Sequence, residues 1–447
     1  MTNITLYNLE KILSKFGYFF FSNILTILCS FIVLKFLTNY YTPDLLKYLF
    51  LSQNIFLILY SISFSNIYYL IIKNYSYKIA FYKKNFVKYF YLHLVSSIII
   101  FFILVITLFF LNINSQFKLI IFIINIGLII EPLTLFYYDL FLKKKFKFLF
   151  LAKLISVLIG TLLKLYLIIN KFSLIYICIS FILENIIYMI IINYIFNLYK
   201  NKVNFSFKHL NYLKLLFKNK YMPVLGISAL LTLRLDIFFV NFFLNEVSVS
   251  IYYIASRPVL VIYAVVLIIS KFLYPYYSKF YYIKKNDHDN FYQLLISLIF
   301  LFYLFFFVIF YLFRDFFLIL FGNDYLIGRN LIMYLLVLSF FCSIINEWFN
   351  RMILMKKIIK IIKFHILSVF ISFILNYYFI LFWGIEGVAL SVMFAVVISF
   401  VLVNLDQPKE IILFFSFFSL KLNKMDMHAI KLILIKKKPE TFATKKS

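Results

Sequence analysis

The feature that most constrains this chain is a series of twelve apolar runs, each of about 20 residues or more, separated by short polar segments. A helix rises 1.5 Å per residue, so a run of this length crosses a hydrocarbon core of about 30 Å. Inside lipid the backbone must satisfy its own hydrogen bonds, which favours helices. With 65% hydrophobic residues and a mean hydropathy of +0.98, the chain fits no water-soluble globular class. The sequence predicts an all-α polytopic membrane protein.

The predicted spans fall into two groups of six. The longest basic connection, Asn197–Lys220, lies between the groups. We therefore predict a six-helix bundle over residues 1–196, a basic cytoplasmic linker over 197–220, a second six-helix bundle over 221–403 and a basic interfacial tail over 404–447. The predicted spans are Phe16–Leu37, Leu45–Ile72, Phe90–Leu111, Lys118–Phe141, Leu149–Asn170, Phe172–Phe196, Tyr221–Leu244, Ile251–Tyr274, Phe291–Leu312, Asn330–Asn350, Phe364–Phe382 and Gly384–Val403.

The basic residues predict the orientation of these spans. The formal net charge is +28, and Lys and Arg cluster in every second connection, as in Lys143-Lys144-Lys145. The intervening connections carry isolated cations, such as Lys47 and Lys171. Clustered cations mark cytoplasmic loops, so both termini are predicted to be cytoplasmic. Because the charge is spread over loops rather than gathered on one face, we expect no nucleic-acid partner.

The second half carries charges inside its first two spans. Arg234 and Asp236 lie in one span and Arg257 in the next. A charge near the bilayer centre costs about 2.5–3.5 kcal/mol on insertion scales, so each needs a reason. Positions i and i+2 point to different sides of a helix, so Arg234 and Asp236 cannot neutralise each other side by side. These charges either form structural ion pairs with other helices or line a polar transport cavity.

Two prolines and two further charges extend this candidate set. Glu131 precedes Pro132 and Arg257 precedes Pro258, and a proline in a span removes a backbone donor and favours a kink. Lys164 lies deep in span five, where it either faces a cavity or snorkels outward. Lys153, Ser156 and Gly160 share its face of the helix. Glu184 in span six is a candidate counter-ion for any of these cations.

No motif for an enzyme or a cofactor is present. The chain has no phosphate-binding G-x-x-x-x-G-K-[ST] loop, and its His and Cys residues show neither metal-ligand nor nucleophile spacing. Cys29, Cys178 and Cys342 lie inside apolar runs and are predicted to be packing residues. We predict no catalytic residue, metal or cofactor, and transport that is downhill or coupled to an ion through Asp236, Glu131 or Glu184.

Several motifs resemble the oligosaccharide-unit flippases (Wzx type) of bacterial O-antigen and capsule clusters, within the multidrug/oligosaccharidyl-lipid/polysaccharide exporter superfamily. They cover most of the chain: Pro223, Arg234-Leu235-Asp236, Tyr252-Tyr253-Ile254-Ala255, Leu320-Phe321-Gly322-Asn323-Asp324-Tyr325 and Trp383-Gly384-Ile385-Glu386-Gly387-Val388-Ala389. The resemblance implies two bundles around an alternately opened cavity, as in the MATE-like fold. It also implies transfer of an undecaprenyl-diphosphate-type oligosaccharide across the bacterial cytoplasmic (inner) membrane, for lipopolysaccharide or capsule biosynthesis.

The cationic substrate-binding residues that this resemblance predicts are Arg234 and Arg257, with Lys164 added from its depth in span five. Expected partners are the lipid-linked oligosaccharide, membrane lipids, a glycan polymerase and chain-length proteins. One alternative is an ion-coupled drug or small-molecule exporter of the same superfamily, which a lone acid in an apolar pocket would favour. A membrane glycan polymerase is a second alternative, but the longest outer loop, Phe313–Arg329, is short for such an enzyme.

Overall fold

The structure, a computed structural model, describes residues 2–63, 79–143, 145–198, 236–244, 246–283, 285–355 and 357–418. Within these ranges every regular element is a helix, and ten candidate spans are long and apolar enough to cross a membrane. The predicted all-helical polytopic fold class is confirmed.

The first half is built from helices that match the first six predicted spans. α5 and α6 belong to one predicted span, and a short 3-10 turn at Glu131–Leu133 separates them. The helices are α1 (Thr2–Tyr40), α2 (Pro43–Ile62), α4 (Ile79–Phe110), α5 (Ser115–Ile130), α6 (Thr134–Leu142), α7 (Phe146–Ile169) and α8 (Leu174–Leu198).

The second half begins with a helical stretch over residues 236–243, and the rest of the predicted span Tyr221–Leu244 lies outside the described residues. α14 covers the last two predicted spans and is interrupted at Gly384, whose φ of +55° is not helical. This break falls at the predicted boundary between the spans. The helices that follow residue 244 are α11 (Glu246–Ile283), α12 (Lys285–Ile319), α13 (Arg329–Leu354), α14 (Ile358–Val403) and α15 (Pro408–Phe414).

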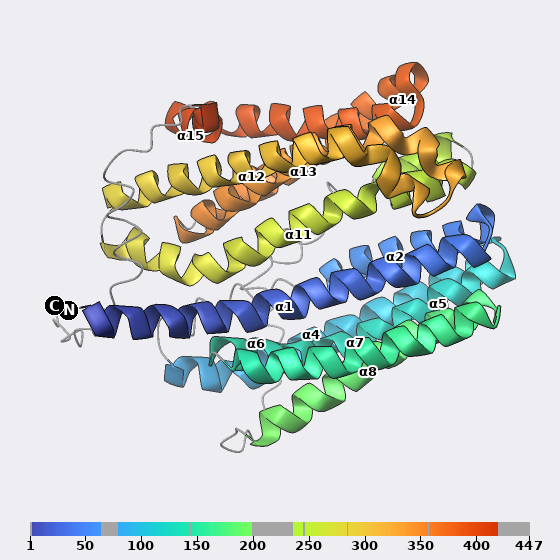
Figure 1. Ribbon diagram of the computed structural model, residues 1–447, viewed down its shortest axis with the longest axis horizontal. Coiled ribbons are helices and arrows are strands. Elements are labelled where there is room, and N and C mark those ends of the chain that lie inside the picture. Colours follow the sequence, from blue (N-terminus) through green and yellow to red (C-terminus); the bar gives the residue numbers. More distant parts are fainter. Residues whose placement is uncertain are drawn as a thin grey trace.

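The two halves form two adjoining layers, α1–α8 in one and α11–α15 in the other (Figure 1). The start of α1 and the helix α15 lie at the same end of the molecule, which we call the near end, and we call the opposite end the far end. Basic residues between consecutive helices, including Lys143, Lys145 and Lys357, lie at the near end. This is the end that the positive-inside pattern predicts to be cytoplasmic.

The halves meet where α11 packs on α1 and α2. The Ser250 hydroxyl donates a hydrogen bond of 2.8 Å to the carbonyl oxygen of Pro43, at the far end. Phe50 of α2 stacks on Tyr253 of α11 with ring centroids 3.6 Å apart. These contacts hold the halves together in the far-end part of α2 and α11, next to the candidate site.

Candidate functional site

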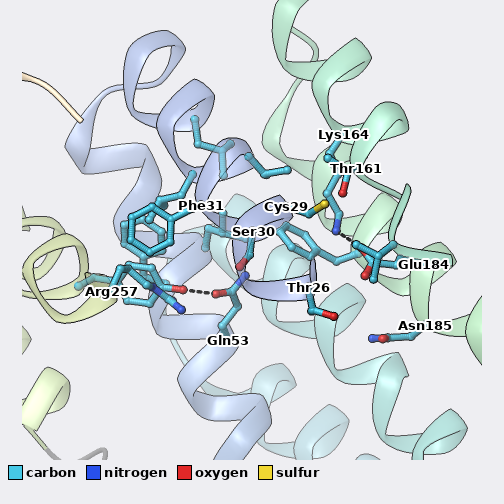
Figure 2. A pocket seen from close by; sticks show the side chains of 18 residues that line it. Thr26, Cys29, Ser30, Phe31, Gln53, Thr161, Lys164, Glu184, Asn185 and Arg257 are labelled. Carbon is cyan, nitrogen blue, oxygen red and sulfur yellow. Dashed lines mark hydrogen bonds and ion pairs between the residues drawn. The ribbon is translucent and has the colours of Figure 1, made fainter. Parts of the chain in front are cut away.

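A cavity of about 220 Å³ lies between the two halves of the molecule. Its walls come from α1, α2, α7 and α8 of the first half and from α11 of the second half. Three of the charged residues singled out from the sequence line it together: Lys164, Glu184 and Arg257. Figure 2 shows Arg257 on one side and the Lys164–Glu184 pair on the other, with Cys29 and Ser30 of α1 between them.

Lys164 and Glu184 form an ion pair within this cavity. The Lys164 ammonium donates a hydrogen bond to Oε2 of Glu184, and the Lys164 residue is only 4% exposed. The same ammonium lies 3.9 Å from the ring centroid of Phe181, a cation–π distance. Of the two positions expected for Lys164, the structure has the one in the cavity, and Glu184 is its counter-ion.

Gly160 allows this ion pair to form close to α7. A Cβ atom at Gly160 would lie 2.7 Å from Cβ, Cγ and Oε2 of Glu184. Such a distance is below any normal contact, so a larger residue would push the Glu184 side chain away from α7. The predicted face of Lys153, Gly160 and Lys164 is therefore the face on which the carboxylate lies.

Arg257 is held against an aromatic stack. Its guanidinium carbon lies 3.6 Å from the ring centroid of Tyr253, one helical turn away on α11. The other face of this tyrosine stacks on Phe50 of α2 with an interplanar angle of 12°. The Tyr253 hydroxyl donates a hydrogen bond to Oε1 of Gln53. The stack orients the planar guanidinium at the interface of the halves, where it borders the cavity.

A row of alternating charges continues from the cavity toward the near end. Lys153 lies within electrostatic range of both Glu184 and Glu131, and its ammonium is 4.8 Å from the ring centroid of Tyr188. Glu131 occupies the 3-10 turn between α5 and α6, where Pro132 interrupts the helix. The order of charge along the first half is Lys164, Glu184, Lys153, Glu131.

Asp236, by contrast, lies inside the second half and does not line the cavity. Its Oδ2 accepts a hydrogen bond of 2.7 Å from the Tyr252 hydroxyl, and its Oδ1 accepts one of 2.7 Å from the Ile237 backbone N–H. The predicted substrate-binding residue Arg234 lies outside the described residues. α11 is one continuous helix across Pro258, where the sequence predicts a kink.

Comparison with known proteins found solved structures of similar fold. The sequence matches no protein-family profile and no curated protein at a significant level. An inward-facing multidrug resistance MATE transporter of the MOP superfamily superposes with a TM-score of 0.64, at 14% identity over 89% of this chain and 96% of the other. The lipid II flippase MurJ, in an inward closed conformation, gives 0.61 at 19% identity, covering 93% and 95%. A MOP superfamily transporter from Pyrococcus furiosus gives 0.62 at 14% identity, covering 88% and 95%.

The chain has the MOP-transporter fold. Identities this low establish the fold and leave the transported substrate open. The fold is the one that the resemblance found in the sequence implies.

A buried carboxylate in the second half of this MOP-type fold was missed by the sequence reasoning. Glu347 on α13 is 3% exposed, and the Asn350 side-chain amide donates to its Oε2 at 3.4 Å. The amides of Asn346 and Asn350 also donate to the Ser270 hydroxyl of α11, at 3.3 and 3.1 Å. The signal available was a Glu with two Asn residues within one turn at the end of an apolar run.

A second missed group fixes the near end of the second half. Arg351 directly follows the predicted span Asn330–Asn350, but it lies on α13 and is only 2% exposed. Its guanidinium lies 2.7 Å from Oδ1 of Asp289 and donates a hydrogen bond of 3.2 Å to Oε1 of Glu410. Since Glu410 belongs to α15, the described part of the predicted tail packs on the bundle, where Phe414 is fully buried.

Proposed function

We propose that this protein is a flippase that moves a polyprenyl-diphosphate-linked oligosaccharide unit across the bacterial inner membrane for surface polysaccharide assembly. The observation that carries the proposal is a cavity at the interface of the halves with cationic side chains from both, Lys164 from the first and Arg257 from the second. The fold, shared with a lipid II flippase and with multidrug transporters, supports the class of transporter.

The chemistry of the cavity suits an anionic headgroup. An arginine guanidinium presents a planar fork that can bind two phosphate oxygens at once, and an ammonium adds a compact second charge. Gln53, Thr161 and Asn185 supply neutral hydrogen-bonding groups for sugar hydroxyls. The volume of about 220 Å³ lies below the ~300–1,000 Å³ of pockets that enclose a drug-sized ligand. The cavity would hold the diphosphate and its first sugar, while the polyprenyl tail stays in lipid.

The arrangement of the halves supports alternating access to this cavity. The contacts made by Ser250 and Tyr253 join the halves toward the far end. The basic segments at the near end are consistent with a cytoplasmic location of this end and of both termini. Substrate would enter from the cytoplasmic leaflet and leave after the far-end contacts separate, for use by a glycan polymerase and chain-length proteins.

The drug-exporter alternative requires an acid that is available to a cationic drug. MATE multidrug transporters are among the structural neighbours, so the fold permits this function. The carboxylate in the cavity, however, is that of Glu184, and Lys164 neutralises it. Among the described residues, the charged side chains that line the cavity are two cations and one anion, which favours an anionic ligand.

Replacement of Arg257 tests the proposal. In cells that depend on this protein, Arg257→Ala should abolish surface glycan display while the amount of protein in the membrane stays near normal. Arg257→Lys should retain partial display, because the charge survives and the two-pronged hydrogen bonding is lost. Arg314→Ala is the matched control, since Arg314 bonds to Asn330 in the far-end segment, away from the cavity. Normal display by Arg257→Ala would refute the proposed role of this cation.

A further inference from the structure

Glu184 occupies a position in the cavity that an anionic ligand would need. Its carboxylate accepts the hydrogen bond of the Lys164 ammonium, and both side chains line the cavity. In Figure 2 this pair lies across the cavity from Arg257. A carboxylate and a phosphate are both pure acceptors for an ammonium group, so they compete for Lys164.

The surroundings of the pair favour exchange of partners over permanent neutralisation. The side chain of Glu184 retains 13% exposure to the cavity, whereas that of Lys164 retains 5%. Lys153, which lies toward the near end of the same row of charges, is close enough to interact with Glu184. A displaced carboxylate therefore has a second cation to move toward, and it need not remain as an unpaired charge in the membrane.

We propose that Glu184 is an internal competitor for the anionic headgroup of the substrate, which pairs with Lys164 until an acidic group of the ligand takes its place. On binding, the ligand accepts the hydrogen bonds of Lys164, and the Glu184 carboxylate turns toward Lys153. This inference rests on the proposed function and adds a basis for selectivity. Neutral lipids and neutral glycans cannot displace a carboxylate from an ammonium group, whereas a diphosphate or an acidic sugar can.

The test measures anion binding to the purified full-length protein in phosphatidylcholine nanodiscs, which contain no anionic lipid. Inorganic pyrophosphate and glucuronate are titrated separately by calorimetry. The comparison shows whether a phosphate or an acidic sugar is the anion that binds Lys164. Glu184→Gln removes the competing charge and should tighten binding of at least one probe by about ten-fold or more. Asp139→Asn removes a carboxylate from the ion pair with Lys143 outside the cavity and should leave both affinities within about two-fold.

A double replacement shows whether the gain depends on Lys164. In a Lys164→Gln background, adding Glu184→Gln should give no gain, because the ammonium that the carboxylate blocks is absent. If Glu184→Gln does not fold, Gly160→Ala provides the test. Its Cβ would push Glu184 away without changing the charge, and it too should tighten binding.

The outcomes separate this inference from the proposed function. Unchanged or weaker binding in both Glu184→Gln and Gly160→Ala, or a gain that persists without Lys164, would overturn the competitor role. If Arg257→Ala nevertheless weakens pyrophosphate binding, the diphosphate site of the proposed function survives. Equal binding by the wild type and Arg257→Ala would refute that site, while a gain in Glu184→Gln would still support the competitor. Absence of binding in every variant would refute both.

Discussion

The Tyr252 hydroxyl donates a hydrogen bond of 2.7 Å to Oδ2 of Asp236, and both residues are buried inside the second half. Of the two roles that the sequence left open for Asp236, this contact favours a structural one. The carboxylate fixes the described part of span seven to α11, on which the cavity residue Arg257 lies. It does so without lining the cavity.

Replacement of Asp236 should therefore change stability more than binding. Asp236→Ala leaves the buried Tyr252 hydroxyl without this acceptor and should cost about 1–3 kcal/mol of unfolding free energy. Asp236→Asn retains an acceptor oxygen and should cost less. Thermal unfolding and pyrophosphate affinity measured on the same preparations check this, and the affinity should hold in both variants. A stable Asp236→Asn protein that no longer transports would instead favour a role in ion coupling.

The ring beneath Arg257 provides a second prediction. Tyr253→Leu removes the aromatic face on which the guanidinium rests, a contact worth about 0.5–2 kcal/mol. Pyrophosphate binding should weaken by roughly 2- to 30-fold in that variant. Tyr253→Phe keeps the ring and loses only the hydrogen bond to Gln53, so it should bind within about three-fold of the wild type. If the phenylalanine variant bound as poorly as the leucine variant, the hydroxyl would be the important group.

The motif Trp383–Ala389 at the start of span twelve contains two glycines, Gly384 and Gly387, that should differ in their tolerance of alanine. A Cβ at Gly387 would lie 2.1 Å from the carbonyl oxygen of Phe379, so the backbones of the two arms of α14 would have to separate. Gly384 has a φ of +55° but open space around its Cβ position, and alanine there should cost about 1–3 kcal/mol through backbone strain alone.

We expect Gly387→Ala to unfold at a lower temperature than Gly384→Ala. The control is Gly17→Ala, whose Cβ would meet nothing within 4 Å and which should be neutral or slightly stabilising. The reverse order of Gly384 and Gly387 would mean that the arms of α14 separate at little cost.

Hydropathy predicted the spans well and the ends of the helices poorly. The predicted span Ile251–Tyr274 lies within α11, Glu246–Ile283, and the helix starts earlier and ends later than the apolar run. Polar residues that continue a helix past the hydrocarbon core carry no hydropathy signal. The break at Gly384 was predictable, because glycine at the junction of two apolar runs marks a turn.

The candidate site was predictable only in part. Lys164 and Glu184 lie on consecutive helices with a short connection, so the sequence could suggest the ion pair. The meeting of Arg257 with α1 and α2 depends on how the two halves pack, and periodicity within one helix contains no information about that. One available signal was overlooked: Tyr253 precedes Arg257 by four residues, the spacing at which helical side chains stack.

The orientation of the chain can be tested with reporter fusions. A reporter fused after Asn245 follows span seven and should be found outside the cell, and one fused after Asn286, near the start of α12, should be found inside. Each fusion acts as the control for the other. Opposite labelling at either position would contradict the predicted topology, and with it the entry of substrate from the cytoplasmic leaflet.

The last prediction concerns Arg351, whose guanidinium contacts Asp289 and Glu410 at the near end. Arg351→Ala leaves the largely buried Glu410 without this cation, while Lys409 still pairs with Asp289, so unfolding should become easier by about 3–5 kcal/mol. The partly exposed Arg314 provides the control, because its replacement by alanine should change stability by less than about 1 kcal/mol.

Since Arg351 does not line the cavity, the folded fraction of Arg351→Ala should bind pyrophosphate as the wild type does. Thermal unfolding followed by calorimetry on the remaining folded protein measures both quantities. Equal stability of Arg351→Ala and Arg314→Ala would mean that α15 is held by its apolar contacts alone, chiefly the stacking of Phe414 on Phe400 at 4.0 Å.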